Sequence, residues 1–239
     1  MGKSMANASF FSDICTVRCK GMCCDPWWGI ISYNAVKNGG LSNLDEFKAE
    51  LVKGIKAREK RIVEGYVTKE ARSRSLFVSP EKYNVTIREI KINGNSIALS
   101  IMAMFAFRCL FLSGDKACMI HPAVIGGDDI RPPHCGYMGS LHVRPGEKGY
   151  CRIIHAAESG IEAEVNRAVQ MEKGSSDAHF RGGVKTAEEA AGNLIEWIKA
   201  YCAKNALELF SLQSEQKQPG RNAPCHCGSG AKFKKCHGR

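Results

Sequence analysis

The residues best suited to chemistry in this 239-residue sequence are its twelve cysteines. Many of them stand in short groups, and two of them, Cys23 and Cys24, are neighbours in the chain. Thiolate sulfur binds soft and borderline metals such as zinc, copper(I) and iron. Closely spaced cysteines suit chelation better than the closure of disulfide loops, so a disulfide-rich secreted domain is the weaker alternative. The cysteines therefore predict metal binding.

The C-terminal segment has the spacing of a small zinc site. A structural zinc ion takes four ligands at tetrahedral corners, commonly cysteine and histidine. The predicted ligands are Cys225, Cys227, Cys236 and His237. Cys225 and Cys227 can reach one ion only through a tight turn, and Gly228 and Gly230 supply the backbone freedom for it. Because Phe233 is the one large apolar side chain after residue 219, the metal would have to supply the folding free energy.

This segment also resembles a known motif. Arg-Asn, Pro-Cys-x-Cys-Gly-Ser-Gly, Lys-Phe-Lys-Lys and Cys-His-Gly follow one another between Arg221 and Gly238. The series resembles the SEC-C motif, the zinc tail first known from the bacterial preprotein translocase ATPase. The resemblance covers about a tenth of the chain. It implies a zinc site and an adaptor role toward partner proteins or ribosomes, and the basic residues of the tail would suit an acidic protein or RNA surface.

A second cysteine group lies near the N-terminus and comprises Cys15, Cys19, Cys23 and Cys24. On a helix the first three would stack on one face, whereas in a loop Gly21 would permit a tighter wrap. Both arrangements bring soft ligands together, which suits zinc, copper(I) or an iron–sulfur cluster. The radical-SAM pattern C-x3-C-x2-C is missed by one residue, because position 22 is Met. No glycine-rich loop for a nucleotide is evident, so a radical-SAM enzyme is the weaker interpretation.

Further cysteines follow in the middle of the chain. They stand in Cys109-Leu-Phe-Leu, in Cys118-Met-Ile-His121 and in Arg131-Pro-Pro-His134-Cys135. Together with the doublet, this order resembles the YkgJ-type cysteine-cluster family, over about half of the chain. The resemblance implies a zinc- or iron-chelating domain, with flagellin lysine methylases among its relatives. The chain departs from the family pattern in two places. The spacing in the first cysteine group is longer than in the commonest form, and the interval between Cys118 and Arg131 contains Gly-Gly-Asp-Asp at residues 126–129.

The second resemblance carries over a set of ligands for the main cluster. These are Cys15, Cys19, Cys23, Cys24, Cys109, Cys118 and Cys135. Seven thiolates are too many for one zinc ion, so two zinc ions, or one iron–sulfur cluster with further thiols, remain open. Cys151, His121 and His134 stay undecided as ligands. Arg131 is expected to offset cluster charge or to donate hydrogen bonds to sulfur.

Helices and strands must position these groups. Apolar residues at helical spacing predict a helix over residues 41–74, with Ser42 as its N-cap. Alternating β-branched residues around Asn-Gly predict a β-hairpin over residues 85–104. Residues 113–149 hold many glycines and prolines, which predicts an irregular loop held by ligands. The mixture predicts an α+β fold.

The last third of the sequence is predicted to be helical up to a linker. Helical spacing returns over residues 151–172, and a Thr186–Glu189 capping box begins a helix that is expected to reach about residue 210. Cys202 on that helix is expected to be a core cysteine. Residues 211–220 are polar and end in Pro-Gly, which predicts a linker. The expected domains are therefore a cysteine-cluster domain at 1–210 and a zinc knuckle at 221–239.

The charge and hydropathy of the chain bear on its partners. The net charge of +10 favours nucleic-acid binding, but a zinc ion held by three thiolates and a neutral histidine adds 2 − 3 = −1 to that sum. Part of the basic excess can therefore balance thiolates. No apolar run approaches the roughly 18–20 residues that cross a bilayer, and no signal peptide is recognisable. We expect a cytoplasmic protein without membrane segments.

The main prediction is a metal-binding protein whose zinc knuckle recruits a protein partner. One alternative is an enzyme that modifies proteins, by analogy with the methylase relatives. A further alternative is a ribosome- or RNA-associated adaptor. The sequence leaves open whether the protein is catalytic.

Overall fold

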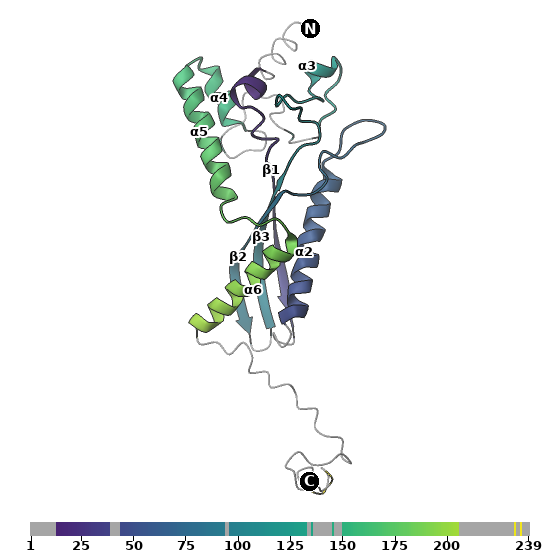
Figure 1. Cartoon of the computed structure of the whole chain (residues 1–239), viewed down its shortest axis with the longest axis vertical. Coiled ribbons are helices and arrows are strands. Elements are labelled where there is room, and N and C mark those ends of the chain that lie inside the picture. The colour runs from purple at the N-terminus through teal and green to yellow at the C-terminus, as the bar shows by residue number, and fades with distance from the viewer. Residues whose placement is uncertain are drawn as a thin grey trace.

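The computed structural model describes residues 13–38, 44–93, 96–132, 135, 145, 150–205, 232 and 235. The elements run in the order η1 (Ile14–Arg18), β1 (Trp27–Lys37), α2 (Leu44–Gly65), β2 (Lys82–Asn93), β3 (Ser96–Phe107), α3 (Pro122–Ile125), α4 (Arg152–Glu158), α5 (Glu162–His179) and α6 (Ala187–Lys204) (Figure 1). The fold is α+β, as the sequence predicted.

One three-stranded antiparallel sheet carries the fold, in the order β1-β3-β2. Residues alternate along the first part of β3, with Ile97, Leu99 and Ile101 buried and their neighbours half-buried. This period of two turns one row of apolar side chains to the same face. Strands β2 and β3 form the predicted hairpin, which begins earlier and ends later than expected.

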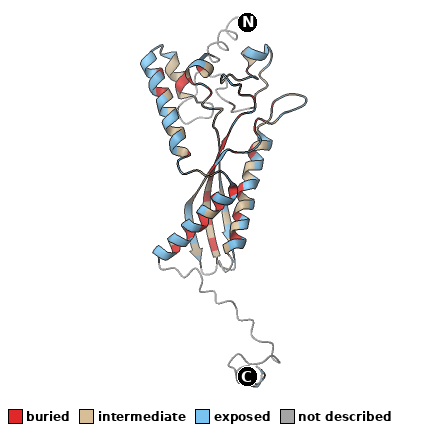
Figure 2. Ribbon diagram, in the orientation of Figure 1, coloured by how far each residue is buried: buried red, intermediate tan, exposed pale blue. Residues whose placement is uncertain are grey.

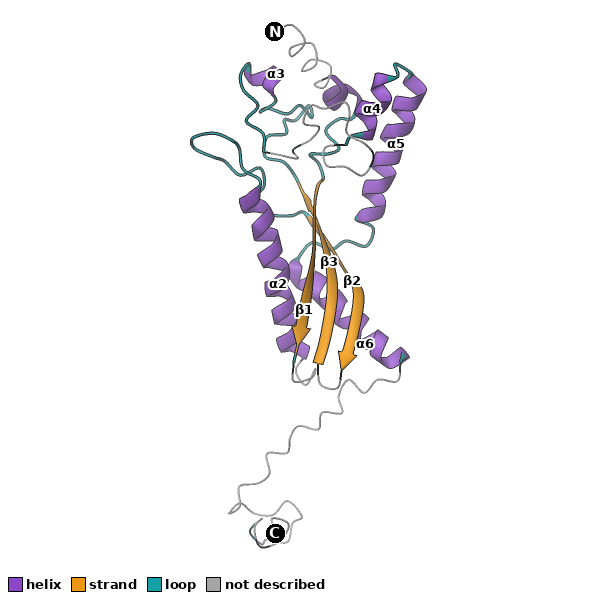
Figure 3. Ribbon diagram, turned by 180° about the vertical axis from the view of Figure 1, so that it is seen from behind, coloured by secondary structure: helices purple, strands orange, loops and turns teal. Residues whose placement is uncertain are grey.

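Helices α2 and α6 cover the same face of the sheet, as Figure 3 shows from behind. The predicted stripe of α2 is confirmed, because Phe47, Leu51, Ile55 and Ile62 are buried. The helix ends at Gly65, however, and not near residue 74 as predicted. The chain folds back there, since the N–H of Leu76 donates to the carbonyl of Tyr66 at 2.9 Å. The predicted N-cap, Ser42, lies outside the described residues.

Helix α6 begins as the sequence predicted. The N–H of Glu189 donates to Thr186 Oγ1 at 3.1 Å, and the Glu189 carboxylate accepts from the N–H of Thr186 at 3.2 Å. These reciprocal bonds satisfy two otherwise unpaired N–H groups at the start of the helix. Cys202 is fully buried, which confirms it as a core residue. The helix ends at Lys204, and the predicted extension from residue 206 falls outside the described ranges.

Strand β1 was not predicted. Its residues alternate between exposed and more buried positions, and Trp27 packs its ring 4.5 Å from Tyr66 and 4.7 Å from Phe77. Aromatic and β-branched residues in Trp-Trp-Gly-Ile-Ile-Ser-Tyr were the available signal. Because β1 starts three residues after the cysteine doublet, it fixes the doublet at the end of the sheet.

The described elements form two ends. Hairpin β2–β3, α2 and α6 make one end, while η1, α3, α4 and α5 gather at the other (Figure 1). Buried residues follow the strands and the inner sides of α2 and α6, whereas α5 is largely exposed (Figure 2). The helix predicted over 151–172 is two helices, α4 and α5, separated at Gly160, whose φ is +69°. Within the described ranges, no helix combines the length and apolarity needed to cross a membrane.

Candidate metal centre

The first cysteine group lies on a tight turn. Element η1 lasts five residues, and Lys20 and Gly21 then take positive φ angles of 52° and 69°. Cys15, Cys19 and Cys23 therefore do not share one helix face, and the loop alternative holds. A Cβ on Gly21 would lie 3.0 Å from Leu112 Cδ1 and 3.3 Å from the Lys116 carbonyl. Both the backbone angle and this close approach require glycine.

The turn packs directly against the second cysteine group. The N–H of Cys109 donates to the carbonyl of Cys24 at 3.0 Å, and Lys116 Nζ lies 2.7 Å from Asp25 Oδ2. A bridge between Leu112 and Cys118 closes the second group into its own turn. Two groups more than 80 residues apart in the sequence therefore lie side by side.

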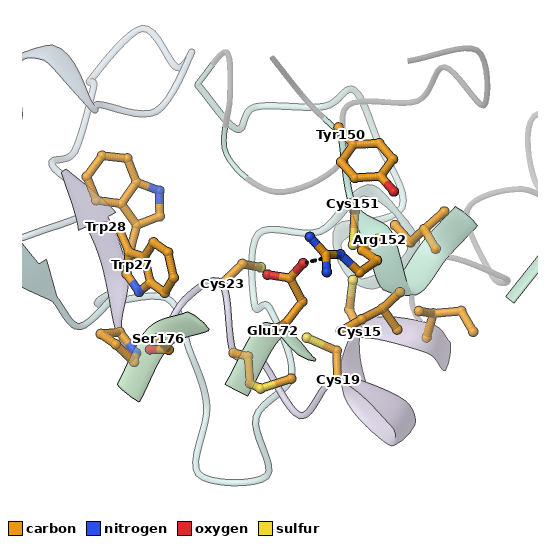
Figure 4. Close-up of a pocket in the computed structure, with 15 residues that line it drawn as sticks. Cys15, Cys19, Cys23, Trp27, Trp28, Tyr150, Cys151, Arg152, Glu172 and Ser176 are labelled. Atoms are coloured by element: carbon orange, nitrogen blue, oxygen red, sulfur yellow. Dashed lines mark ion pairs between the residues drawn. The ribbon is translucent and has the colours of Figure 1, made fainter. Parts of the chain in front are cut away.

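Most of the thiols line two neighbouring hollows. A cavity of about 280 Å³ is lined by Cys15, Cys19, Cys23 and Cys151 among other residues (Figure 4). A smaller one, of about 40 Å³, is lined by Cys15, Cys23, Cys24, Cys118 and Cys135, together with His121 and Arg131. Cys109 is buried, and its thiol interacts electrostatically with those of Cys118 and Cys135. The seven predicted main-cluster cysteines thus gather at one end of the molecule.

The thiols are near one another without forming a complete coordination shell. Cys23 Sγ and Cys24 Sγ are 3.9 Å apart, close to the ~3.8 Å that two sulfurs of a tetrahedral zinc site would show at Zn–S of ~2.3 Å. No three Cys, His, Asp or Glu side chains converge tightly enough to hold one ion in the part of the chain that the structure describes. The donor types fit a soft metal, and side-chain rotation would have to complete the shell.

Burial keeps these thiols protonated in the absence of a cation. Burial, together with the neighbouring thiols of Cys19 and Cys151, raises the pKa of Cys15 to about 12. Burial, with the charges of Cys109 and Cys118, likewise raises the pKa of Cys135 to about 12. A metal ion must therefore displace protons when it binds, because only thiolates are strong ligands.

Arg131 supplies a permanent positive charge beside the smaller cavity. Its guanidinium is largely buried and forms two bonds of 2.9 Å to the carboxylate of Asp129. Burial alone would raise the pKa of the Asp129 carboxyl, but the hydrogen bonds and charge of Arg131 outweigh it and leave that pKa lowered. The predicted role of Arg131 fits this position, since its charge favours ionised Cys118 and Cys135.

Three side chains had been left undecided as ligands. Cys151 caps α4 at its start, and its thiol interacts electrostatically with that of Cys19. His121 is buried, and burial lowers its pKa, which keeps the imidazole in the neutral form that binds metals. His134 lies outside the described residues, as do Cys225, Cys227, Cys236 and His237 of the predicted knuckle.

The larger cavity also has walls that sequence reasoning did not assign. Trp27 and Trp28 form part of its lining. Arg152 and Glu172, which were not singled out, face the same space and form an ion pair of 3.2 Å (Figure 4). Their sequence neighbourhood gives no motif, and the packing of α4 on α5 alone brings them to the thiols.

Comparison with known proteins identifies the C-terminal segment. Residues 221–239 match the family model of the SEC-C motif. The protein translocase subunit SecA of Vesicomyosocius okutanii is 65% identical over 28 residues, which are 12% of this chain and 3% of SecA. SecA of Methylibium petroleiphilum is 51% identical over 37 residues, 16% of this chain and 4% of SecA. The chain therefore covers a few per cent of these relatives, and no solved structure matches it.

Proposed function

We propose that this chain is a metal-binding protein with two metal regions. The first is a main cluster like that of the YkgJ-type family, which would hold zinc or iron, including an iron–sulfur cluster. Its proposed ligands include Cys15, Cys19, Cys23, Cys24, Cys109, Cys118 and Cys135. The second is a zinc knuckle at Cys225, Cys227, Cys236 and His237. The gathering of distant cysteines around two hollows at one end of the molecule is the observation that supports the main cluster.

The chemistry of this end favours a cation over a purely structural role for the thiols. Buried thiols lose little by staying protonated and neutral, but a soft ion would convert them into thiolate ligands and stabilise the turns that bear them. Arg131, which is paired with Asp129, stands beside Cys118 and Cys135 and would offset part of the negative charge of their thiolates. The thiols and the positive charge beside them come from distant parts of the sequence and are brought together by the fold.

Metal content is the direct test. The full chain, purified anaerobically, is expected to contain either about three zinc equivalents or iron with acid-labile sulfide plus one zinc equivalent. An absorption spectrum distinguishes the two, because iron–sulfur clusters are brown and zinc sites are colourless. A protein with one zinc equivalent and no other metal would refute metal binding at the main cluster, while the zinc site of the knuckle would stand.

The knuckle is proposed to dock a protein partner. The SEC-C match and the basic residues of the tail, among them Lys232 and Lys235, support this role. Deletion of residues 219–239 should remove partners from a pull-down that the full chain retains, and the Cys225→Ser, Cys227→Ser double variant should do the same. Retention of every partner by both variants would refute the docking role, and co-sedimentation with ribosomes would favour the adaptor alternative.

The larger cavity favours a second candidate, an enzyme that modifies proteins. A space of about 280 Å³ beside the thiols, with two tryptophans and an Arg152–Glu172 pair in its walls, could take a small cosubstrate as well as a metal. By analogy with the methylase relatives, S-adenosylmethionine is the compound to try. Calorimetry should detect its binding to the metal-loaded chain, and Trp28→Ala should weaken it; absence of heat would count against this candidate.

A further inference from the structure

We propose that the eight cysteines of this end form two separate four-thiolate metal sites, and that Cys151 is the fourth ligand of one of them. The inference rests on the proposed metal-binding function and refines its ligand set. The site at the larger cavity comprises Cys15, Cys19, Cys23 and Cys151. The site at the smaller cavity comprises Cys24, Cys109, Cys118 and Cys135.

The lining of the cavities supports this division. Cys19 and Cys151 line the larger cavity alone, while Cys24, Cys118 and Cys135 line the smaller one alone. Cys15 and Cys23 line both. With Cys109, which interacts with Cys118 and Cys135, the smaller site already has four sulfurs. The two shared cysteines are therefore left for the larger site, where four thiolates satisfy one tetrahedral ion.

Electrostatic interactions among the four thiols of the larger site agree with this assignment. Cys15 interacts electrostatically with both Cys19 and Cys151, and Cys19 interacts with Cys23. Cys23 Sγ also lies 3.9 Å from Cys24 Sγ, so the two sites meet at the cysteine doublet. In Figure 4 the sulfurs of Cys15, Cys19 and Cys151 lie in one region, next to Arg152. Cys151 comes from a different element than the other three, so the fold, and not the spacing, joins it to them.

The apolar packing of the molecule divides the cysteines along the same line. Cys19 and Cys151 pack in a small cluster with Ile14, Ile153 and Ile154. The cysteines Cys24, Cys109, Cys118 and Cys135 all belong to the main core of the sheet and its helices. Cys15 and Cys23 belong to neither cluster, so the packing separates Cys19 and Cys151 from the four cysteines of the smaller site.

Helix α5 acts as the scaffold that holds the larger site together. Arg18 at the end of η1 pairs with Glu162 at the start of α5, while Arg152 pairs with Glu172 further along the same helix. These pairs hold the segments of Cys15 and Cys151 against one support.

Titration of the metal-free, reduced full chain with Co²⁺ under anaerobic conditions tests the proposal. The wild type is expected to bind three equivalents with the absorption of tetrahedral thiolate sites, two in the main cluster and one in the knuckle. Cys151→Ala should lose one equivalent, or bind it about 100-fold more weakly in a chelator competition. Cys109→Ala should lose a different single equivalent, and the double variant should lose both. Cys151→His, which restores a donor, should recover binding.

Controls separate this proposal from the proposed function. Cys202→Ala removes a buried cysteine outside both sites and should keep three equivalents, while circular dichroism verifies that each variant retains its fold. Three equivalents of unchanged affinity in Cys151→Ala would overturn the assignment of Cys151. Loss of both main-cluster ions from either single variant would overturn the separation into two sites. A wild type that binds one equivalent would instead refute the main cluster itself.

Discussion

The two ends of the molecule are stabilised by different physical means. The sheet end buries large apolar side chains such as Phe47, Leu99 and Phe105 between β3 and helices α2 and α6. The cysteine end combines short turns with helices α4 and α5, and it has a small apolar cluster of six buried residues, two of them Ile153 and Ile154. Its second cysteine group packs on the main core. Apolar burial scales with the area removed from water, so the first end can fold without ligands. The second end buries fewer apolar side chains, and we propose that a metal bound by its thiols stabilises it.

The cysteine end is the better place for a binding site. A site made of turns keeps its donors free of secondary-structure constraints, so that they can converge on an ion from several directions. The sheet then serves as a rigid base, since β1 and β3 lead directly into the two cysteine groups. Perturbing each end separately tests whether the two ends are stabilised independently.

Removal of metal should produce the largest effect, and it should be confined to the cysteine end. We expect chelation to speed amide exchange at Cys109 and Met119 by about 100-fold, because metal binding supplies folding free energy to such segments. The amide of Ile101, in the middle of β3, should change by less than about threefold. Hydrogen–deuterium exchange with and without added zinc measures both. Equal loss of protection at the two ends would show that they are one unit.

Truncation of the sheet core should cost the whole fold several kcal/mol. Phe105 is fully buried and lies 5.8 Å from the ring of Tyr83. Phe105→Ala is expected to lower the free energy of unfolding by about 3–5 kcal/mol, as deletion of a buried phenyl ring leaves a cavity. Ser100→Ala, a half-buried site on the same strand, should change it by less than about 0.5 kcal/mol. Urea denaturation gives the free energy of unfolding of both variants. Similar losses in the two would contradict the core position of Phe105.

A smaller loss should follow from crowding the point where β1 meets α2. A Cβ on Gly29 would lie 2.5 Å from Ile62 Cδ1 and 3.0 Å from the Trp27 ring. We expect Gly29→Ala to destabilise by about 1–3 kcal/mol, because the buried isoleucine has to shift. Gly54→Ala is the matched control: its Cβ would meet Tyr33 at 3.6 Å, and alanine within a helix gains about 0.5–1 kcal/mol. The midpoint of thermal unfolding should therefore fall in Gly29→Ala and rise in Gly54→Ala.

The smallest expected effect is a local pH dependence between the two ends. Hydrogen bonds from Arg74 and Thr68 lower the pKa of the Glu70 carboxyl, next to the bond of 2.7 Å from the N–H of Lys69 to the carbonyl of Ile130. The folded pKa lies below the unfolded value of ~4.3, so this stabilisation is present above that pH and is lost as pH falls through the folded pKa. An NMR titration should give a midpoint below ~4.3, and Arg74→Gln should raise it.

The sequence predicted the sheet end better than the cysteine end. Periodicity gave the α2 stripe, the β2–β3 hairpin and the α6 capping box, since each depends on residues within a few positions of one another. It missed β1 and misplaced the end of α2, because both depend on contacts with distant residues such as Tyr66 and Phe77. Sequence patterns of this kind reflect interactions between residues that are close in the chain, and they do not reveal contacts with distant residues.

The sequence by itself determined the donor chemistry of this protein. Its cysteine spacings and the SEC-C segment can be recognised without coordinates, because they are properties of neighbouring residues. Only the tertiary structure brought Cys151 to Cys15 and Cys19, set Arg152 and Glu172 beside them, and divided the thiols between two cavities. Those arrangements arise where helices α4 and α5 pack against the turn of the first cysteine group, and no spacing along the chain encodes that packing.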